Sequence, residues 1–314
     1  MNDFECNLDY AKLTIQAANS YTLFSCSIKD SASNLPDGVK GFGFDENPEL
    51  AKTKAKYELY ERIAFCKEFP KGPPSSSTSN GYAAHTTADG ARNHAILELI
   101  ERHTFLYSWF HKLPVLEVNS VNLSKLSPVV CNDVKYLRDL GFEIQAGFIA
   151  KSADLFVSYC RLMGYGKDRP FGSIISTGIS QNPSLSIKNA VLDNLRNWEL
   201  YRNGLLHKEI NDKNITNDSN SKWTIKHHRR FHLNPQNKQY TDWYFGNLTD
   251  NLVEMKSIQS QAHIIHRDKS IPLYIYRATS DDPIFFDLVA GHAKASYNRA
   301  DLNIDHLNSI HPFC

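Results

Sequence analysis

A short helical pattern occurs three times in this chain, and two of the three copies end in the motif Glu-x-x-Glu-Arg. Each copy begins with a residue type that caps helices, at Asn47, Thr87 and Asn182, and proline follows both asparagines, where it is favoured. Each copy ends in three polar residues at one spacing: Glu58, Glu61 and Arg62; Glu98, Glu101 and Arg102; and Asp193, Arg196 and Asn197. The pattern predicts three related helices that each carry one polar face.

The paired glutamates indicate a cation site. Residues three apart lie on one face of a helix, so the two carboxylates of a copy point the same way. Carboxylates from two helices would suit a hard divalent cation such as Mg²⁺, which usually binds together with a nucleotide phosphate. The predicted metal ligands are Glu58, Glu61, Glu98 and Glu101.

A single Glu-x-x-Glu-Arg segment is more often a solvated helix face with weak ion pairs. The second copy differs from such a face, because apolar residues including Leu97, Leu99 and Ile100 surround its glutamates. A helix that is apolar on nearly every side is normally buried, and buried carboxylates need a cation or a hydrogen-bond donor. The repeat therefore favours the cation site.

The composition is that of an ordinary globular protein of 314 residues, with 41% hydrophobic and 22% charged residues. A net charge near +1 gives no reason to expect nucleic acid or an anionic membrane as a partner. The N-terminus lacks the features of a signal peptide, and no apolar run reaches the length of a membrane span. The six cysteines form no Cys-x-x-Cys pair, which argues against structural zinc and against a disulfide framework. We expect a cytoplasmic protein with reduced thiols.

Strand and helix patterns interleave along the chain, which favours an α+β fold with helices packed on antiparallel or mixed sheets. Helices are expected at about 47–67, 87–111, 128–140 and 183–203. Strands are expected at about 10–27, 142–149, 154–163, 173–178, 273–277 and 284–286. The composition between 205 and 250 shifts to Asn, Lys, His and Ser, which predicts a polar surface insertion in a single domain spanning 1–314.

Several segments resemble signature motifs of the YcaO superfamily, in the family's order from about residue 38 to the end. Gly41-Phe42-Gly43 with the helix ending at Arg62 resembles the first motif, and Asn80-Gly81 with the helix ending at Arg102 resembles the second. Ser176-Thr177-Gly178 with Asn182-Pro183 is similar to the third. The ending His311-Pro312-Phe313-Cys314 is similar to the proline-rich terminus of the azoline-forming members.

The resemblance implies an ATP-dependent cyclodehydratase that activates backbone amides of a ribosomally made precursor peptide. A substrate Cys, Ser or Thr side chain would add to the amide carbonyl, and ATP would phosphorylate the resulting oxyanion, giving thiazoline or oxazoline. The implied cofactors are ATP and Mg²⁺. The implied ATP-binding residues are Glu58, Glu61, Arg62, Asn80, Glu98, Glu101, Arg102, Asp193 and Arg196.

Three residues are expected to take part in the reaction itself: Arg102, Arg196 and Cys314. Arg62 and Arg102 would contact phosphate or orient the carboxylates, since the guanidinium fork suits both tasks. The terminal carboxylate of Cys314 could act as a general base. Asn80 is a lesser candidate for a nucleotide contact, and a plain Asn-Gly turn is the other interpretation of that position.

The chain departs from the family pattern at several motif positions. Lys54 stands where the first motif usually has Ser, and His94 and His103 replace usual residues around the second. In the third motif, Asp193 and Arg196 stand where Glu and Gln are typical. The four glutamates are all present, so we expect ATP binding to be retained.

The resemblance also implies partners, since family members of this compact size rely on a protein that binds the leader of the precursor peptide, and sometimes on a flavin-dependent oxidase that converts azolines to azoles. One alternative keeps the ATP site but uses sulfide as the nucleophile, which would give a thioamide. Another is a catalytically silent scaffold whose signature helices persist for folding. A module that binds only a metal fits less well, because arginines flank the carboxylates.

Overall fold

The structure is a computed structural model that describes residues 8–16, 20–28, 39–69, 78–119, 122–123, 125, 127–165, 170–204, 231–237, 239–268 and 272–286. The chain divides into two compact units, one made of Met1–Ile100 and Ile258–Phe285, the other of Glu101–Ser257 and Phe286–Cys314. Compact units can be parts of one domain, so the single domain stays a prediction. Helix α2 (Ala88–Phe110) contributes residues to both units.

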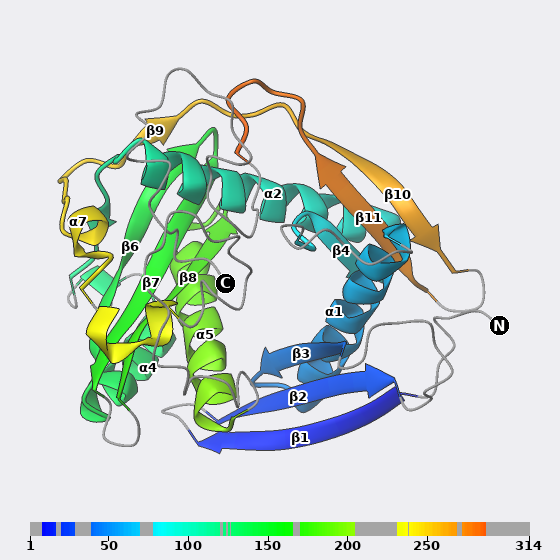
Figure 1. The fold of residues 1–314 in the computed structure, drawn as a ribbon, viewed down its shortest axis with the longest axis horizontal. Coiled ribbons are helices and arrows are strands. Elements are labelled where there is room, and N and C mark those ends of the chain that lie inside the picture. The colour runs from blue at the N-terminus through cyan, green and yellow to red at the C-terminus, as the bar shows by residue number, and fades with distance from the viewer. Residues whose placement is uncertain are drawn as a thin grey trace. The chain divides into compact units, whose positions relative to one another are not determined.

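The first unit contains two antiparallel three-stranded sheets. One has the order β1 (Leu8–Gln16), β2 (Ser20–Ile28) and β3 (Lys40–Asp45), and helix α1 (Pro48–Glu68) packs against β2 and β3 (Figure 1). The other has the order β10 (Gln261–Arg267), β11 (Tyr274–Thr279) and β4 (Tyr82–His85). Buried residues of α1, including Leu59 and Ile63, pack with Leu273 and Ile275 in one core.

The second unit is built on a larger sheet. Its order is β5 (Leu116–Glu117), β6 (Glu143–Ser152), β7 (Leu155–Tyr165) and β8 (Pro170–Ser180), and β9 (Glu254–Met255) pairs parallel to β6. Helix α5 (Pro183–Arg202) packs on β7 and β8, and α4 (Pro128–Asp139) contacts α5 and β6 (Figure 1). The short helices η1 (Pro235–Asn237) and α7 (Asp242–Phe245) complete the unit. These sheets and helices confirm the α+β class.

The three predicted helix starts are confirmed. The side chain of Asn47 accepts the backbone N–H groups of the second and third helical residues of α1, and Asn182 does the same for α5. Thr87 caps α2 through its hydroxyl, which accepts the N–H of Gly90 at 3.1 Å. In each copy the cap's own N–H is bound by the side chain two residues earlier: Asp45, His85 and Ser180.

The repeat extends into the strand before two of the three helices, α1 and α5. Gly43 of β3 and Gly178 of β8 lie directly against the backbone of the following helix, where a Cβ would clash with the carbonyl oxygens of Ala51 and Ser186 respectively. Each of these carbonyls is eight residues after its glycine. Glycine is required here because strand and helix backbones approach too closely for a side chain.

Some strands were predicted wrongly. The stretch 10–27 is two strands rather than one, and 284–286 is not a strand. Strand β3 was missed because its glycines weaken a strand pattern, and β4 was missed because it is four residues long. Strand β10 was also missed; its seven residues include two histidines and an arginine.

The predicted surface insertion differs from the structure in its second half. Residues 205–230 lie outside the described residues. Within 231–250, Phe231, Leu233, Tyr244 and Phe245 are all buried. This part of the segment belongs to the core of the second unit, and the polar composition around it masked the apolar positions. In the parts of the chain that the structure describes, no helix has both the length and the apolar character to cross a bilayer.

Replacement of Gly178 by Ala should lower the free energy of unfolding by about 1–3 kcal/mol, because the added methyl group must displace the backbone of α5. Urea denaturation followed by circular dichroism measures the change. Lys135→Ala, an exposed substitution on α4 of the same unit, should stay within about 0.5 kcal/mol of the wild type. Equal free energies of unfolding for Gly178→Ala and the wild type would contradict the close approach of β8 to α5.

Candidate functional site

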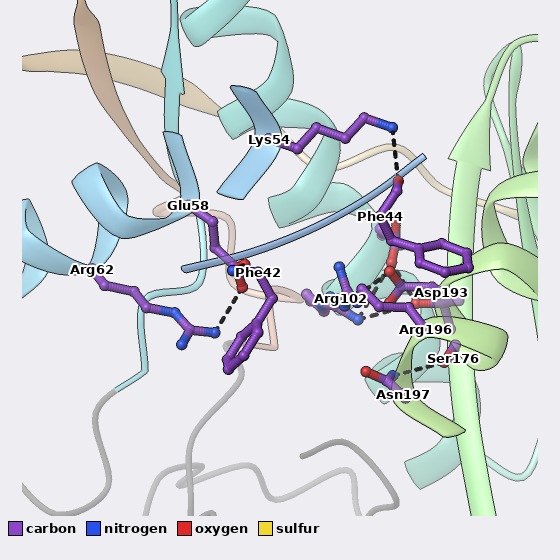
Figure 2. A network of polar contacts seen from close by, with 12 residues as sticks. Phe42, Phe44, Lys54, Glu58, Arg62, Arg102, Ser176, Asp193, Arg196 and Asn197 are labelled. Atoms are coloured by element: carbon purple, nitrogen blue, oxygen red, sulfur yellow. Dashed lines mark hydrogen bonds and ion pairs between the residues drawn. The ribbon is translucent and has the colours of Figure 1, made fainter. Parts of the chain in front are cut away.

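In the first unit, Arg62 and Glu58 form an ion pair on α1. Arg62 Nη2 lies 2.7 Å from Glu58 Oε1 (Figure 2). The same arginine donates from Nη1 to the backbone carbonyl of Lys40. The other oxygen of Glu58 accepts the backbone N–H of Phe42 on β3. Arg62 and β3 therefore hold the Glu58 carboxylate in one orientation, which is one of the two tasks expected of this arginine.

Glu61 lies beside two more carboxylates. Its Oε1 accepts the backbone N–H of Ala84 at 2.8 Å, from strand β4. Loss of water contact raises the pKa of Glu61 well above its usual range, and the charges of Glu98 and Glu58 raise it further, while the Ala84 hydrogen bond and Arg62 act in the opposite direction. Three of the four predicted metal ligands thus form one like-charged group, which a bound cation would stabilise.

In the second unit, Thr177 joins Glu101 and Arg102. The Thr177 hydroxyl donates to Glu101 Oε1 and accepts a hydrogen bond from Arg102 Nη1 at 3.1 Å. The same two side-chain atoms, Glu101 Oε1 and Arg102 Nη1, lie 3.4 Å apart. Burial raises the pKa of Glu101, Arg102 and Thr177 lower it, and the charge of Asp193 raises it.

The third copy contributes an internal ion pair. Arg196 Nη2 lies 2.9 Å from Asp193 Oδ1, and both side chains are about one-third exposed or less (Figure 2). Asn197, at the position of the arginine in the other copies, donates to Ser176 Oγ at 3.2 Å. Asp193 is therefore partly neutralised by its own helix, as Glu58 is by Arg62 in the first copy.

The donor set of the first unit fits Mg²⁺ bound together with phosphate. Within the described residues, no three His, Cys, Asp or Glu side chains are gathered closely enough to hold a metal ion by themselves. Mg²⁺ rarely uses such an all-protein cage; it usually takes one or two carboxylates and completes its shell with water and phosphate oxygens. Glu61 with Glu58 or Glu98 supplies such a pair.

The predicted site residues thus fall into two groups. Glu58, Glu61, Arg62 and Glu98 belong to the first unit, and the other group in the second unit is Glu101, Arg102, Asp193 and Arg196. Helix α2 contributes a carboxylate to each group. A single site holding all four glutamates stays a prediction.

Two further candidates stay predictions as well. Asn80 lies in the turn before β4, where its backbone N–H donates to Thr78 Oγ1 at 3.3 Å and the N–H of Tyr82 donates to the carbonyl of Ser79. This geometry is that of the Asn-Gly turn. Cys314 lies outside the described residues.

The residues that depart from the family pattern have structural contacts. Lys54 Nζ lies 2.7 Å from Asp45 Oδ2, next to the cap of α1. The rings of His94 and His85 meet edge to face with centroids 5.4 Å apart. His103 is buried and its Nδ1 accepts the backbone N–H of Phe286.

Two contacts to the glutamates were not foreseen as parts of the site. The N–H of Ala84 binds Glu61, and the hydroxyl of Thr177 binds Glu101. In both cases the donor comes from the strand that precedes the next helix of the repeat. The repeat gave no signal for these donors, since Ala84 lies three residues before its helix cap and Thr177 lies five residues before its own.

The family comparison matches most of the repeat region. Residues 61–268 match the family model described as YcaO cyclodehydratase, ATP- and Mg²⁺-binding. A search of curated proteins found no match to the sequence.

Solved structures agree on the fold. One subunit of the E. coli microcin synthetase McbBCD complex matches with a TM-score of 0.66 and 12% identity, over 97% of this chain and 96% of that chain. YcaO from Methanopyrus kandleri bound with AMPPCP and Mg²⁺ matches with a TM-score of 0.57 and 11% identity, over 86% and 84%. A heterocyclase in complex with substrate and cofactor matches with a TM-score of 0.59 and 12% identity, over 98% of this chain and 55% of that chain. At these identities the likeness shows a YcaO-like fold, as the motifs predicted.

Without nucleotide and Mg²⁺, the free energy of unfolding should fall as the pH rises above about 4.3, the pKa of glutamate in an unfolded chain. The folded protein holds the Glu61 proton more tightly than the unfolded chain does, so this stabilisation is complete below that pH and is lost as the pH rises through the folded-state pKa. The slope for one proton reaches at most about 1.4 kcal/mol per pH unit.

Glu61→Gln should reduce this slope, as measured by urea denaturation at a series of pH values. Glu101, whose pKa is also raised, should leave a residual slope of the same sign. Glu49→Gln, an exposed change in the first turn of α1, serves as the control. If the free energy of unfolding changed with pH equally steeply in Glu61→Gln and in the wild type, the raised pKa of Glu61 would be contradicted.

Proposed function

Because the chain belongs to the YcaO family, we propose that it is an ATP-dependent enzyme that activates backbone amides of a ribosomally made peptide, converting Cys, Ser or Thr residues to azolines. The observation that carries the proposal is the like-charged group of Glu58, Glu61 and Glu98, oriented by Arg62. Partly buried acidic groups that repel one another fit a cation better than they fit a structural role.

The first unit would hold Mg²⁺ through its glutamates. ATP, when bound, supplies the phosphoryl group that turns the amide oxygen into a leaving group. Glu61 and a neighbouring glutamate would ligate the metal, and Arg62 would keep Glu58 correctly oriented. Arg102 and Arg196 are the guanidinium groups of the second unit that would neutralise phosphate charge.

Each ring that forms removes one equivalent of water from the peptide. The substrate thiol or hydroxyl forms a bond to the amide carbon, the amide oxygen departs as inorganic phosphate, and ATP becomes ADP. The nucleophile must lose its proton, and the amide nitrogen loses its own as the C=N bond forms. The terminal carboxylate of Cys314 is the proposed acceptor of one of these protons, by the resemblance of the chain's ending to that of the azoline-forming members.

A partner protein is part of the proposal. The matched microcin synthetase subunit belongs to a complex, and a second structure of that complex contains bound pro-MccB17. By analogy, a partner that binds the leader of the precursor peptide would bring the substrate to this chain. A flavin-dependent azoline oxidase would act afterwards on the product.

A catalytically silent scaffold is the second candidate, and one observation favours it. In the third copy, Arg196 neutralises Asp193 within the helix, so this copy presents less free negative charge than the others. A scaffold would fold in the same way but release no phosphate with any peptide. The thioamide alternative differs from the azoline reaction only in its external sulfide nucleophile.

Incubation with ATP, Mg²⁺, precursor peptide and partner protein should release one phosphate for each water equivalent lost by the peptide, as measured by phosphate assay and mass spectrometry. Loss of water indicates azoline, whereas exchange of oxygen for sulfur would indicate a thioamide. Glu61→Gln should slow the reaction by roughly 100-fold or more, since changes beside metal ligands alone cost about 10- to 100-fold. Glu49→Gln should react like the wild type. If the wild type released no phosphate with any cognate peptide, the enzyme proposal would be contradicted and the catalytically silent scaffold would be favoured.

A further inference from the structure

The Thr177 hydroxyl lies between the carboxylate of Glu101 and the guanidinium of Arg102. It donates a hydrogen bond to Glu101 Oε1 and accepts one from Arg102 Nη1, and these two atoms are 3.4 Å apart. A hydroxyl is suited to this position because it can donate and accept at once. Thr177 is itself buried, so no bulk water is there to take its place.

The bridge leaves the second oxygen of the Glu101 carboxylate available. Among the described residues, Glu101 Oε2 accepts no hydrogen bond, since every recorded contact of this carboxylate is made through Oε1. A direct two-point pair between Arg102 and Glu101 would instead occupy both oxygens. Thr177 thus keeps the carboxylate oriented without saturating it.

The first copy of the repeat provides an independent comparison. Glu61, at the position of Glu101, is also bound by a donor from the next strand of the repeat, and there the donor is the backbone N–H of Ala84. The fold therefore supplies a hydrogen-bond donor to the second carboxylate of both copies. In the second copy this donor is a side chain, which substitution can remove.

We propose that Thr177 is a positioning residue of the ATP–Mg²⁺ site, which acts by holding Glu101 and Arg102 in the orientation that binds metal and phosphate. This role rests on the proposed function.

Calorimetric titration of ATP with Mg²⁺ tests the role. Thr177→Val keeps the shape of the side chain and removes the hydroxyl, and it should weaken binding by about 10-fold. Thr177→Ser restores the hydroxyl and should bind within about 3-fold of the wild type, a rescue that packing alone would not produce. Thr177→Ala is a second variant without the hydroxyl, for use if Thr177→Val does not fold.

Thr104→Val is the matched control. Thr104 is a fully buried threonine of α2, and its hydroxyl has no hydrogen-bond partner within the described part of the chain. This change should leave binding unaltered. The double variant Thr177→Val/Glu101→Gln should lose less binding than the two single losses added together, because part of the effect of Thr177 is exerted through Glu101.

The titration distinguishes failure of the Thr177 role from failure of the proposed function. Binding by the wild type and equally tight binding by Thr177→Val would overturn the role of Thr177 and leave the proposed function in place. Weak binding by Thr177→Ser, equal to that of Thr177→Val, would also overturn it. No binding of ATP by the wild type, with its partner proteins present, would overturn the proposed function and this role with it.

Discussion

The backbone contact between a strand and the helix that follows it determines where the candidate carboxylates of α1 and α5 lie. At Gly43 and at Gly178, the strand lies so close to the next helix that a side chain would not fit. Four residues later an asparagine caps that helix, so both the start and the rotation of the helix are defined. The polar positions of each helix then follow at constant spacing. Loosening this contact would shift every polar position of the helix at once.

The consequence of this arrangement is a group of carboxylates that repel one another. Burial and the charges of Glu58 and Glu98 both raise the pKa of Glu61, and a single N–H from β4 and one arginine oppose them. In the second unit, Glu101 accepts a hydrogen bond from the Thr177 hydroxyl and lies beside the Arg102 guanidinium. A bound metal ion would therefore relieve more charge repulsion in the first unit than in the second, whose arginines are suited to phosphate.

Much of the architecture could be predicted from the sequence. The three capped helices and the long strands β6, β7 and β8 were predicted because their local signals are strong: asparagine–proline starts and apolar strand runs. The glycine-bearing β3 was not, since glycines weaken a strand pattern, and the short β4 was not, since its pairing depends on β11, a segment far away in the chain. The burial of Phe245 within a polar stretch was missed for the same reason.

The candidate site was predicted in part. Spacing on a helix is enough to place Glu58 beside Arg62, because both belong to one element. The grouping of Glu61 with Glu98, and of Glu101 with Asp193, requires packing between elements; only the repeat indicated it. Thr177 was recognised as part of a motif, but its bond to Glu101 depends on the tertiary fold.

The most direct test of the central claim is isothermal titration of ATP, with and without Mg²⁺, into the wild type, Glu98→Gln and the control Glu49→Gln. The account predicts Mg²⁺-dependent binding by the wild type and the control, and at least about 10-fold weaker binding by Glu98→Gln. Equal affinity of all three proteins, or no binding by the wild type in the presence of its partners, would contradict the assignment of the nucleotide site to these carboxylates.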